Sequence, residues 1–368
     1  MEIEKYINRN KNIYKIFLRF LENEEEEEEE LLNLLDNHKI KQNQEELKLF
    51  LRLISKISRN HHRSAYFNDK IEKIILFLKE DIKQTYSNSQ IFNFFKKDKR
   101  ILLFLVQNDL MTIDDTVVKH IYKQRKPKLC HFFYPEIKNF MNEKKREFFE
   151  EELFQYDPNI FDNFEEKRKI GENENYLCSL IRTDSIVDFI SHITRTNYPL
   201  SSEVKPSIFE TNSFLLKNDQ KVSLIEYAAF FGSSQIYQFL RLNNVILKPS
   251  LWLYSIHSNN AEMIHLLEES GIKPNDKTYE KCLEESIKCH HNDISNYFEN
   301  NLIENEFKFN ENIVSYSFHY NNYEHFPDDF LSNKFIFYYA CQFDYLTLVR
   351  IYLKTRPNLN LNAKIVFL

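Results

Sequence analysis

Glycine is so scarce in this chain that several classes of fold and site are excluded. Only three glycines occur in 368 residues, and Gly171, Gly232 and Gly271 are far apart. Phosphate-binding and dinucleotide-binding loops need clustered glycines for tight turns and close backbone approach, so we expect neither loop here. Hairpin-rich β architectures also need glycine at positive φ. The sequence therefore predicts an all-α protein in which Asn forms many of the turns.

The rest of the composition predicts a globular protein with an aromatic core. Hydrophobic residues make up 42% of the chain and charged residues 28%, and 33 Phe and 21 Tyr supply core material. The formal net charge is −6, so we expect no nucleic-acid partner and no attraction to an anionic membrane. We also expect no signal peptide and no transmembrane helix. Five scattered cysteines, an odd number, fit reduced thiols in the cytoplasm, with the nucleus as the alternative.

Residues 1–160 are predicted to form an α-helical N-terminal region. Apolar residues recur there at steps of three and four, which places them on one face of a helix. The predicted helices lie at 13–21, 47–57, 69–82, 98–110 and 113–126. The acidic run Glu24–Glu30 and the basic cluster at 123–128 are interpreted as solvated helix ends or a loose link.

A repeated pattern begins near residue 174, in which an apolar helix, a polar break and a second apolar helix follow one another. The units lie at 175–193, 223–240, 251–271, 282–300, 313–326 and 335–353. Aligned on their polar breaks, they share a small residue at one position: Ser179, Ala228, Ser255, Ser286, Ser317 and Ala340. A small side chain there lets a helix of the next unit approach closely. This spacing is typical of a two-helix repeat.

The polar breaks carry residues that tolerate a left-handed backbone. Gly232 falls where a helix must end, and glycine accepts that conformation without steric cost. Asn259, His290, Asn321 and Asp344 lie at or next to the equivalent turns, and Asn and Asp are the next best residues for it. One unit buries too little apolar area to offset its ordering entropy, so the units are expected to stack.

These units resemble the ankyrin repeat. EYAAFFGSSQIYQFL (226–240) and YYACQFDYLTLVRIYL (338–353) are similar to its A-A-x-x-G-x-x-x-I-V-x-x-L-L core, and PNLNLNA (357–363) is similar to the start of a further repeat. The chain is also similar to a divergent, protist-type ankyrin group with a long helical N-terminal region of unknown function. The similar segments are 54–82, 91–105 and 206–216.

The resemblance implies an α-helical N-terminal region followed by an ankyrin-like α-solenoid of stacked helix-turn-helix repeats. The expected domains are 1–160, then 161–222 with a first unit and a long connecting loop, then a divergent array at 223–368 whose last repeat is incomplete. The T-P-L-H motif that opens a standard repeat is absent, and most units lack the turn glycine. The unit interrupted by Pro327 is expected to lose much of its outer helix.

The sequence shows no recognisable catalytic or metal-binding motif. The residue types best suited to zinc are at Cys282, Cys289, His290 and His291. The short C-x-x-C and H-x-x-x-H pairings are absent, and the two histidines should diverge in a turn, so we expect no metal and no cofactor. Cys130 and His131 adjoin without a third member of a nucleophilic triad. Cys178 and Cys341 are interpreted as small core residues. We therefore expect no enzyme.

The predicted function is a non-catalytic scaffold for protein–protein interaction. In ankyrin-like repeats the inner helices end toward the concave face, where partners dock. The matching positions are Phe230, Phe231, His257, Ser258, Lys288, Cys289, His319, Tyr320, Gln342 and Phe343. Their chemistry changes from unit to unit, as partner-binding positions on a common scaffold would, although a tolerant surface would vary equally. Phe230 and Phe231 are expected to form an exposed aromatic anchor for a protein partner.

Two other functions stay open at this point. An enzyme could have its site in the N-terminal region, and a deep pocket lined by several His, Asp or Glu residues would support it. A self-associating structural element could use the C-terminal repeat face, because the sequence after Asn362 begins a unit without completing it.

Overall fold

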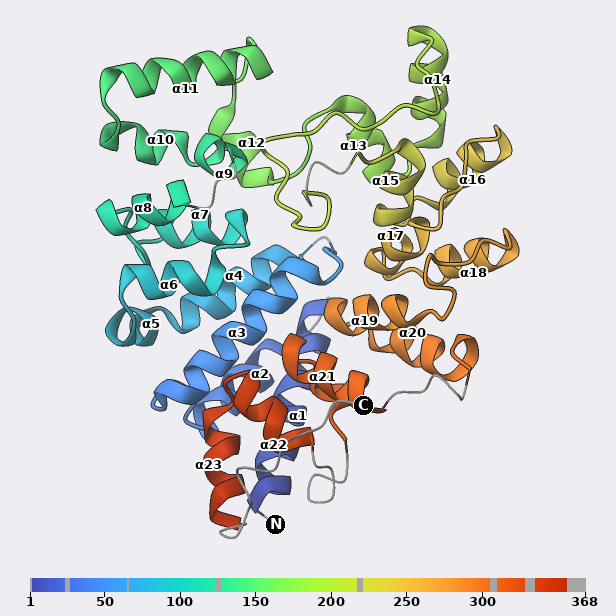
Figure 1. The fold of residues 1–368 in the computed structure, drawn as a ribbon. Coiled ribbons are helices and arrows are strands. Elements are labelled where there is room, and N and C mark those ends of the chain that lie inside the picture. Colours follow the sequence, from blue (N-terminus) through green and yellow to red (C-terminus); the bar gives the residue numbers. More distant parts are fainter. Residues whose placement is uncertain are drawn as a thin grey trace. The chain divides into compact units, whose positions relative to one another are not determined.

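Every regular element in the described part of the chain is a helix, which confirms the all-α prediction (Figure 1). The computed structural model describes residues 2–23, 27–64, 66–123, 127–216, 221–304, 310–327 and 335–355. In these ranges the one β-type pairing is an isolated bridge between Glu203 and Ser223. The predicted further repeat at 357–363, the C-terminal face expected to self-associate, residues 24–26 of the acidic run and residues 124–126 of the basic cluster lie outside the described residues.

The chain divides into two compact units. The terminal unit combines Met1–Leu53 with Glu306–Leu368, and the central unit is Ile54–Asn305. Helix α3 contributes residues to both. The boundaries between these compact units lie near residues 53 and 305. The boundaries predicted at residues 160 and 222 describe changes in the sequence pattern, and they stay predictions.

The terminal unit joins segments that are distant in the sequence. Its elements are α1 (Glu2–Glu22), α2 (Glu27–Asn37), the start of α3 (Gln44–Asn60), α21 (Asn310–Tyr320), η4 (Tyr323–His325), α22 (Phe335–Gln342) and α23 (Leu346–Thr355). Helix α1 buries an apolar stripe that includes Ile13, Phe17 and Leu21, and it packs against α2, α23 and η4. The Tyr14 hydroxyl donates a hydrogen bond of 2.9 Å to Asn322 Oδ1.

The central unit begins with a run of mostly short helices. They are α4 (Phe67–Phe77), α5 (Lys79–Thr85), α6 (Asn88–Phe95), α7 (Lys99–Gln107), α8 (Asp115–Lys123), α9 (Pro127–Phe132), α10 (Tyr134–Ile137), η1 (Lys138–Phe140), α11 (Glu143–Tyr156) and α12 (Phe164–Ile170). The helix predicted at 69–82 is present as two helices, α4 and α5, which meet at Leu78. The Leu78 amide is shared between the carbonyls of Ile74 and Ile75.

Antiparallel helix pairs make up the rest of the central unit. The pairs are α13 (Tyr176–Arg182) with α14 (Ile186–Thr196), α15 (Leu224–Phe231) with α16 (Ser234–Leu242), α17 (Leu251–His257) with α18 (Ala261–Glu269), and α19 (Glu280–Cys289) with α20 (Asn292–Tyr297), which continues into the π-helical turn η2 (Phe298–Leu302). The first helix of each pair, here called the inner helix, packs on that of the next: α13 on α15, α15 on α17, and α17 on α19. Figure 1 shows these pairs following one another along one side of the unit.

The inner helices end in left-handed turns at the predicted residues. Gly232, Asn259, His290, Asn321 and Asp344 have φ values of 71°, 49°, 59°, 60° and 62°. In four of these turns the amide of the next residue bonds back to the carbonyl of the shared small residue, which is the long bond of a Schellman motif. The bonds run from Ser233 to Ala228, His291 to Ser286, Asn322 to Ser317, and Tyr345 to Ala340.

In the first pair the alignment is wrong by one residue. The Ser185 amide bonds to the carbonyl of Leu180, and Asp184 has the left-handed φ of 48°. Leu180, and not Ser179, therefore holds the shared position there, and this pair lacks the small residue. The other five small residues are buried as expected, with 0% or 1% of their surface exposed.

One side-chain hydrogen bond recurs between consecutive pairs. The residue after the left-handed turn donates to a backbone carbonyl near the end of the preceding inner helix. The bonds are Ser233 Oγ to Ile181 O at 2.5 Å, His291 Nδ1 to Ile256 O at 2.7 Å, and Tyr345 Oη to Phe318 O at 3.1 Å. The Ile181 and Ile256 carbonyls also accept the amides of Asp184 and Asn259 in their own terminal turns. A carbonyl oxygen has two lone pairs, so the side-chain bonds are additional and fasten each pair to its neighbour.

One further prediction about the pairs is confirmed: Leu240 and Leu267, expected in the core, are both 0% exposed. In the unit interrupted by Pro327, the described residues after α21 form the short turn η4, and residues 328–334 lie outside the described part of the chain. Trp252 is also fully buried, and its indole N–H donates to Ile272 O at 2.9 Å.

Candidate functional site

The ten residues predicted to bind a partner occupy the ends of the inner helices, and we call them the inner row. They are Phe230, Phe231, His257, Ser258, Lys288, Cys289, His319, Tyr320, Gln342 and Phe343. In the central unit the Phe230 ring stacks on His257, with centroids 5.1 Å apart, and His257 Nδ1 lies 3.5 Å from Cys289 Sγ. In the terminal unit His319 stacks on Phe343, again at 5.1 Å. The structure thus brings row residues of consecutive pairs into contact.

Half of the inner row is buried, which corrects the expectation of an open surface. The buried members are Phe230, His257, Ser258, Cys289 and Tyr320. Phe231, Lys288 and Phe343 are half-buried, and His319 and Gln342 are exposed. The prediction of an exposed aromatic pair is wrong for Phe230, which is only 5% exposed.

The physical reason is that the chain covers this part of the row with its own segments. Phe214, from the long connection between α14 and α15, lies 4.1 Å from the His257 ring and 5.9 Å from the Phe230 ring, centroid to centroid. The Lys288 ammonium lies 5.8 Å from the centroid of Phe214. A second segment, the loop that follows α3, places His61 and His62 beside the ends of α17 and α19.

Three histidines from distant parts of the sequence form a buried hydrogen-bonded cluster. His291 Nδ1 lies 2.7 Å from the carbonyl oxygen of Ile256, so this nitrogen carries the proton and donates. His291 Nε2 then accepts from the backbone N–H of His62 at 3.1 Å and from His61 Nδ1 at 3.1 Å. These roles require a neutral His291 imidazole. Burial, reinforced by His61 and His62, holds the pKa of His291 well below its usual value.

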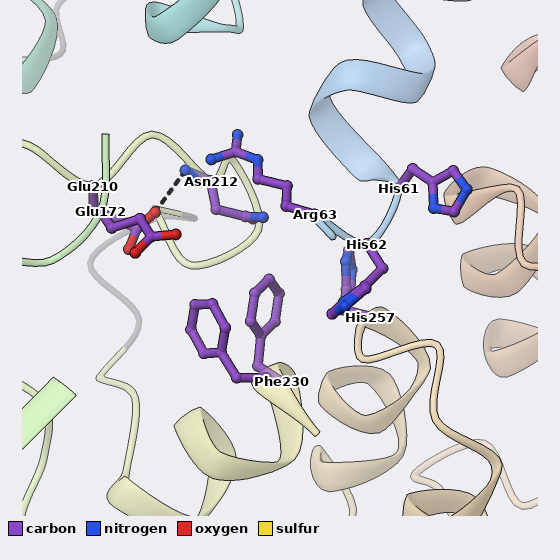
Figure 2. A pocket seen from close by; sticks show the side chains of 9 residues that line it. His61, His62, Arg63, Glu172, Glu210, Asn212, Phe230 and His257 are labelled. Carbon is purple, nitrogen blue, oxygen red and sulfur yellow. Dashed lines mark hydrogen bonds between the residues drawn. The ribbon is translucent and has the colours of Figure 1, made fainter. Parts of the chain in front are cut away.

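A small pocket lies beside this cluster, within the central unit. It is lined by His61, His62, Arg63, Glu172, Glu210, Asn212, Phe230, Phe231 and His257. Figure 2 shows the carboxylates of Glu172 and Glu210 on one side, the imidazoles of His62 and His257 on the other, and Phe230 between them. The cavity has a volume of about 20 Å³. This is room for water or a small ion, and not for an organic substrate.

The pocket disfavours charge on two of its groups. Glu210 is 4% exposed; its Oε1 accepts the Asn212 amide at 2.7 Å, and its Oε2 has no hydrogen-bond partner among the described residues. Burial raises the pKa of the Glu210 carboxyl above its usual value. Burial, with His61 as a neighbour, lowers the pKa of His62 to about 4.

Behind the His257 wall of the pocket, three groups with different donor atoms converge. His257 Nε2 lies 2.7 Å from Glu285 Oε1, and Cys289 Sγ lies 3.5 Å from His257 Nδ1 and 3.7 Å from its Nε2. The ligand atoms of these three residues lie within 4.8 Å of one another. Lys288 donates to the same Glu285 oxygen at 2.5 Å. A thiol next to an imidazole that in turn contacts a carboxylate resembles a nucleophilic triad. Cys289 is 0% exposed, however, so no acyl substrate can reach it.

Sequence reasoning missed this cluster because its members come from two repeats. It singled out Cys289 together with Cys282 and two histidines, but neither Cys282 nor those histidines belong to the group of three. The alignment of the units could have predicted this cluster. It places His257 and Cys289 at neighbouring positions of consecutive units, and Glu285 lies one helical turn before Cys289.

The remaining cysteines form no site in the described part of the chain. All five are free thiols. Cys178 is buried as predicted, but Cys341 is exposed, which corrects its interpretation as a core residue. His131 pairs with Glu152 at 3.1 Å, while the Cys130 thiol lies 3.9 Å from the carbonyl of Ile121. Cys130 and His131 therefore do not act as a pair.

Comparison with protein-family models, curated proteins and solved structures finds no match to this chain. Among the described residues, no helix is both long enough and apolar enough to cross a membrane.

Proposed function

We propose that this protein is a non-catalytic scaffold that binds a protein partner along the inner row of an ankyrin-like α-solenoid. The observation that carries the proposal is that part of the row already holds polypeptide. In the central unit, Phe214 packs on Phe230 and His257, and His62, from the loop after α3, lies beside His257. A surface that binds two segments of its own chain has the chemistry to bind a segment of another protein.

The exposed members of the row belong to the terminal unit. His319 and Gln342 are exposed there and Phe343 is half-buried. The stacked His319 and Phe343 rings are parallel to within 8°, so they offer a flat aromatic surface next to an amide group. Aromatic side chains with adjacent polar groups are frequent anchors of protein interfaces. We therefore expect the partner to contact these three residues.

The recurring bonds between pairs support the solenoid part of the proposal. The same donor position reaches the same carbonyl position at three junctions. In a stacked array each unit depends on its neighbours for burial, and the ends of the inner helices then vary freely. The inner row varies in this way: Phe, His, Lys, His and Gln occupy one aligned position.

Site-specific photocrosslinking tests the proposal directly. A photoreactive amino acid at Phe343 should capture a partner in cells. The same group at Leu353, a 39% exposed residue of the outer helix α23 in the same unit, should not capture it. The captured protein is then purified and titrated against the wild type and the His319→Ala/Phe343→Ala variant, which should weaken binding at least tenfold. Equal capture at both positions, or equal affinity of the variant, would contradict the proposal.

The enzyme alternative is favoured by one observation, the pocket lined by His62, His257 and two glutamates. Its small volume argues against an organic substrate. A Glu210→Gln variant distinguishes the two functions. The scaffold proposal expects unchanged partner affinity, because Glu210 belongs to the central unit and the residues expected to contact the partner belong to the terminal unit.

A further inference from the structure

The cluster behind the pocket has the composition of a transition-metal site. His257 is the last residue of α17, while Glu285 and Cys289 are four residues apart on α19 and so share one face. His257 is 2% exposed, Glu285 9% and Cys289 0%. Imidazole nitrogen, carboxylate oxygen and thiolate sulfur are the three donor types that zinc binds in proteins. Without an ion, the burial of a polar or charged group lowers the stability of the fold unless the group is paired.

The three donors lie close enough to hold one tetrahedral ion once two side chains turn. Zinc bond lengths of about 2.0–2.3 Å imply a sulfur–nitrogen separation of roughly 3.6 Å and a nitrogen–oxygen separation of roughly 3.4 Å. Cys289 Sγ lies 3.7 Å from His257 Nε2 and 3.5 Å from its Nδ1, so the sulfur faces the imidazole ring, and the ring must turn to direct Nε2 at an ion on the thiolate. Glu285 Oε1 lies 2.7 Å from His257 Nε2, and the carboxylate must open this contact by less than an ångström.

We propose that His257, Glu285 and Cys289 bind one zinc ion in the interface between α17 and α19. The thiolate and the carboxylate neutralise the two charges of the ion. The Lys288 ammonium, now 2.5 Å from Glu285, remains as an outer partner that orients the carboxylate, as second-shell groups do in metal sites.

The adjoining pocket meets the cluster at His257, since Glu285 and Cys289 do not line it. In the pocket His257 lies beside His62 (Figure 2). A water molecule would take the fourth position on the ion. Three protein ligands with a water in the fourth position form a known zinc arrangement. The ion would join two consecutive helix pairs, so its loss should loosen their packing.

Cobalt substitution of the full chain tests the site. Protein freed of metal with a chelator is titrated with Co²⁺ and then with Zn²⁺. We expect one equivalent of Co²⁺, with the strong thiolate-to-metal absorption and the visible bands of a four-coordinate ion, and displacement by one equivalent of Zn²⁺. Zinc should also raise the melting temperature. A cobalt spectrum without the thiolate band, or less than a tenth of an equivalent bound, overturns the proposal without reference to any variant.

Matched cysteine variants locate the ligand. Cys289→Ala should weaken zinc binding at least tenfold, whereas Cys282→Ala should leave it unchanged. Both cysteines lie on α19 and are 0% exposed, so the two substitutions remove the same atoms from the same helix. Equal affinities overturn the assignment. If Cys289→Ala fails to fold, as judged by circular dichroism, Glu285→Gln replaces it as the variant expected to lose binding, and unchanged binding there overturns the proposal.

Discussion

The close contact at the Gly232 turn makes a quantitative prediction for alanine substitution. Gly232 has a φ of 71°, and a Cβ built there would lie 3.2 Å from Ser258 Cβ and 3.4 Å from Asn260 Nδ2. The left-handed conformation costs an alanine about 1–2 kcal/mol. The loss of unfolded-state freedom returns about 0.4–1 kcal/mol. Crowding a well-packed interface adds about 1–3 kcal/mol. Gly232→Ala should therefore destabilise the central unit by about 2–4 kcal/mol.

Gly271 provides the matched control. Its φ is also 71°, but a Cβ there would meet nothing within 4 Å. Gly271→Ala has the same cost of a left-handed alanine and the same gain from a less flexible unfolded chain, but it crowds no neighbour. It should therefore lower the free energy of unfolding by about 1 kcal/mol or less. The difference between the two variants isolates the contact between the turn and the next inner helix.

Urea unfolding followed by tryptophan fluorescence measures both values. Trp252 is the only tryptophan of the chain. It is 0% exposed on α17, the helix that carries the neighbour of the Gly232 turn. The slope of the free energy with urea should stay constant while the midpoint falls. Equal destabilisation by the two variants would refute the close contact, and an unchanged midpoint for Gly232→Ala would refute the left-handed helix end.

Three further predictions follow from other buried groups. Ser255→Val should destabilise the central unit by about 1–3 kcal/mol, because Ser255 is 0% exposed at the shared small position; an unchanged urea midpoint would contradict this. Arg168→Met should cost about 3 kcal/mol in the same assay, because the guanidinium is 1% exposed and binds both oxygens of Glu136 at 2.7 and 2.8 Å. Stability should fall as the pH is lowered from 6.5 toward 4. The pKa of His62 is about 4 in the folded protein and that of His291 is also well below 6.5, the value in the unfolded chain. In this pH range the unfolded chain therefore binds more protons than the folded protein, which favours unfolding. The free energies of unfolding from urea titrations at pH 7.5 and pH 5 should differ by about 1–3 kcal/mol, and equal values would count against the buried neutral imidazoles.

The features that sequence could predict depend on short-range preferences. The left-handed turns at Gly232, Asn259 and Asn321 follow from residues that tolerate positive φ. The short turn η4 just before Pro327 agrees with a residue that cannot continue a helix. These preferences act within a few residues, so they are readable without knowledge of the tertiary structure.

The features that were wrong or missed depend on which surfaces meet. Helix α22 is apolar almost all round, so periodicity could not show that Cys341 is exposed. The covering of the inner row by Phe214 and the pairing of His61 with His291 join residues far apart in sequence. No local pattern specifies such pairings. The alignment error at Ser179 arose because that unit has a leucine at the shared position.

The composition of the terminal unit has a consequence for synthesis. The hydrogen bond from Tyr14 to Asn322 spans 308 residues, and at about 5–20 residues per second the ribosome needs roughly 15–60 s to make that stretch. During this interval α1 and its neighbour α2 have been translated, but α23 and η4, which cover the rest of the apolar stripe of α1, have not. Nascent chains of this protein should therefore depend on chaperones that shield an early amphipathic helix, and ribosome profiling of chaperone-bound chains should show their occupancy ending once α23 emerges.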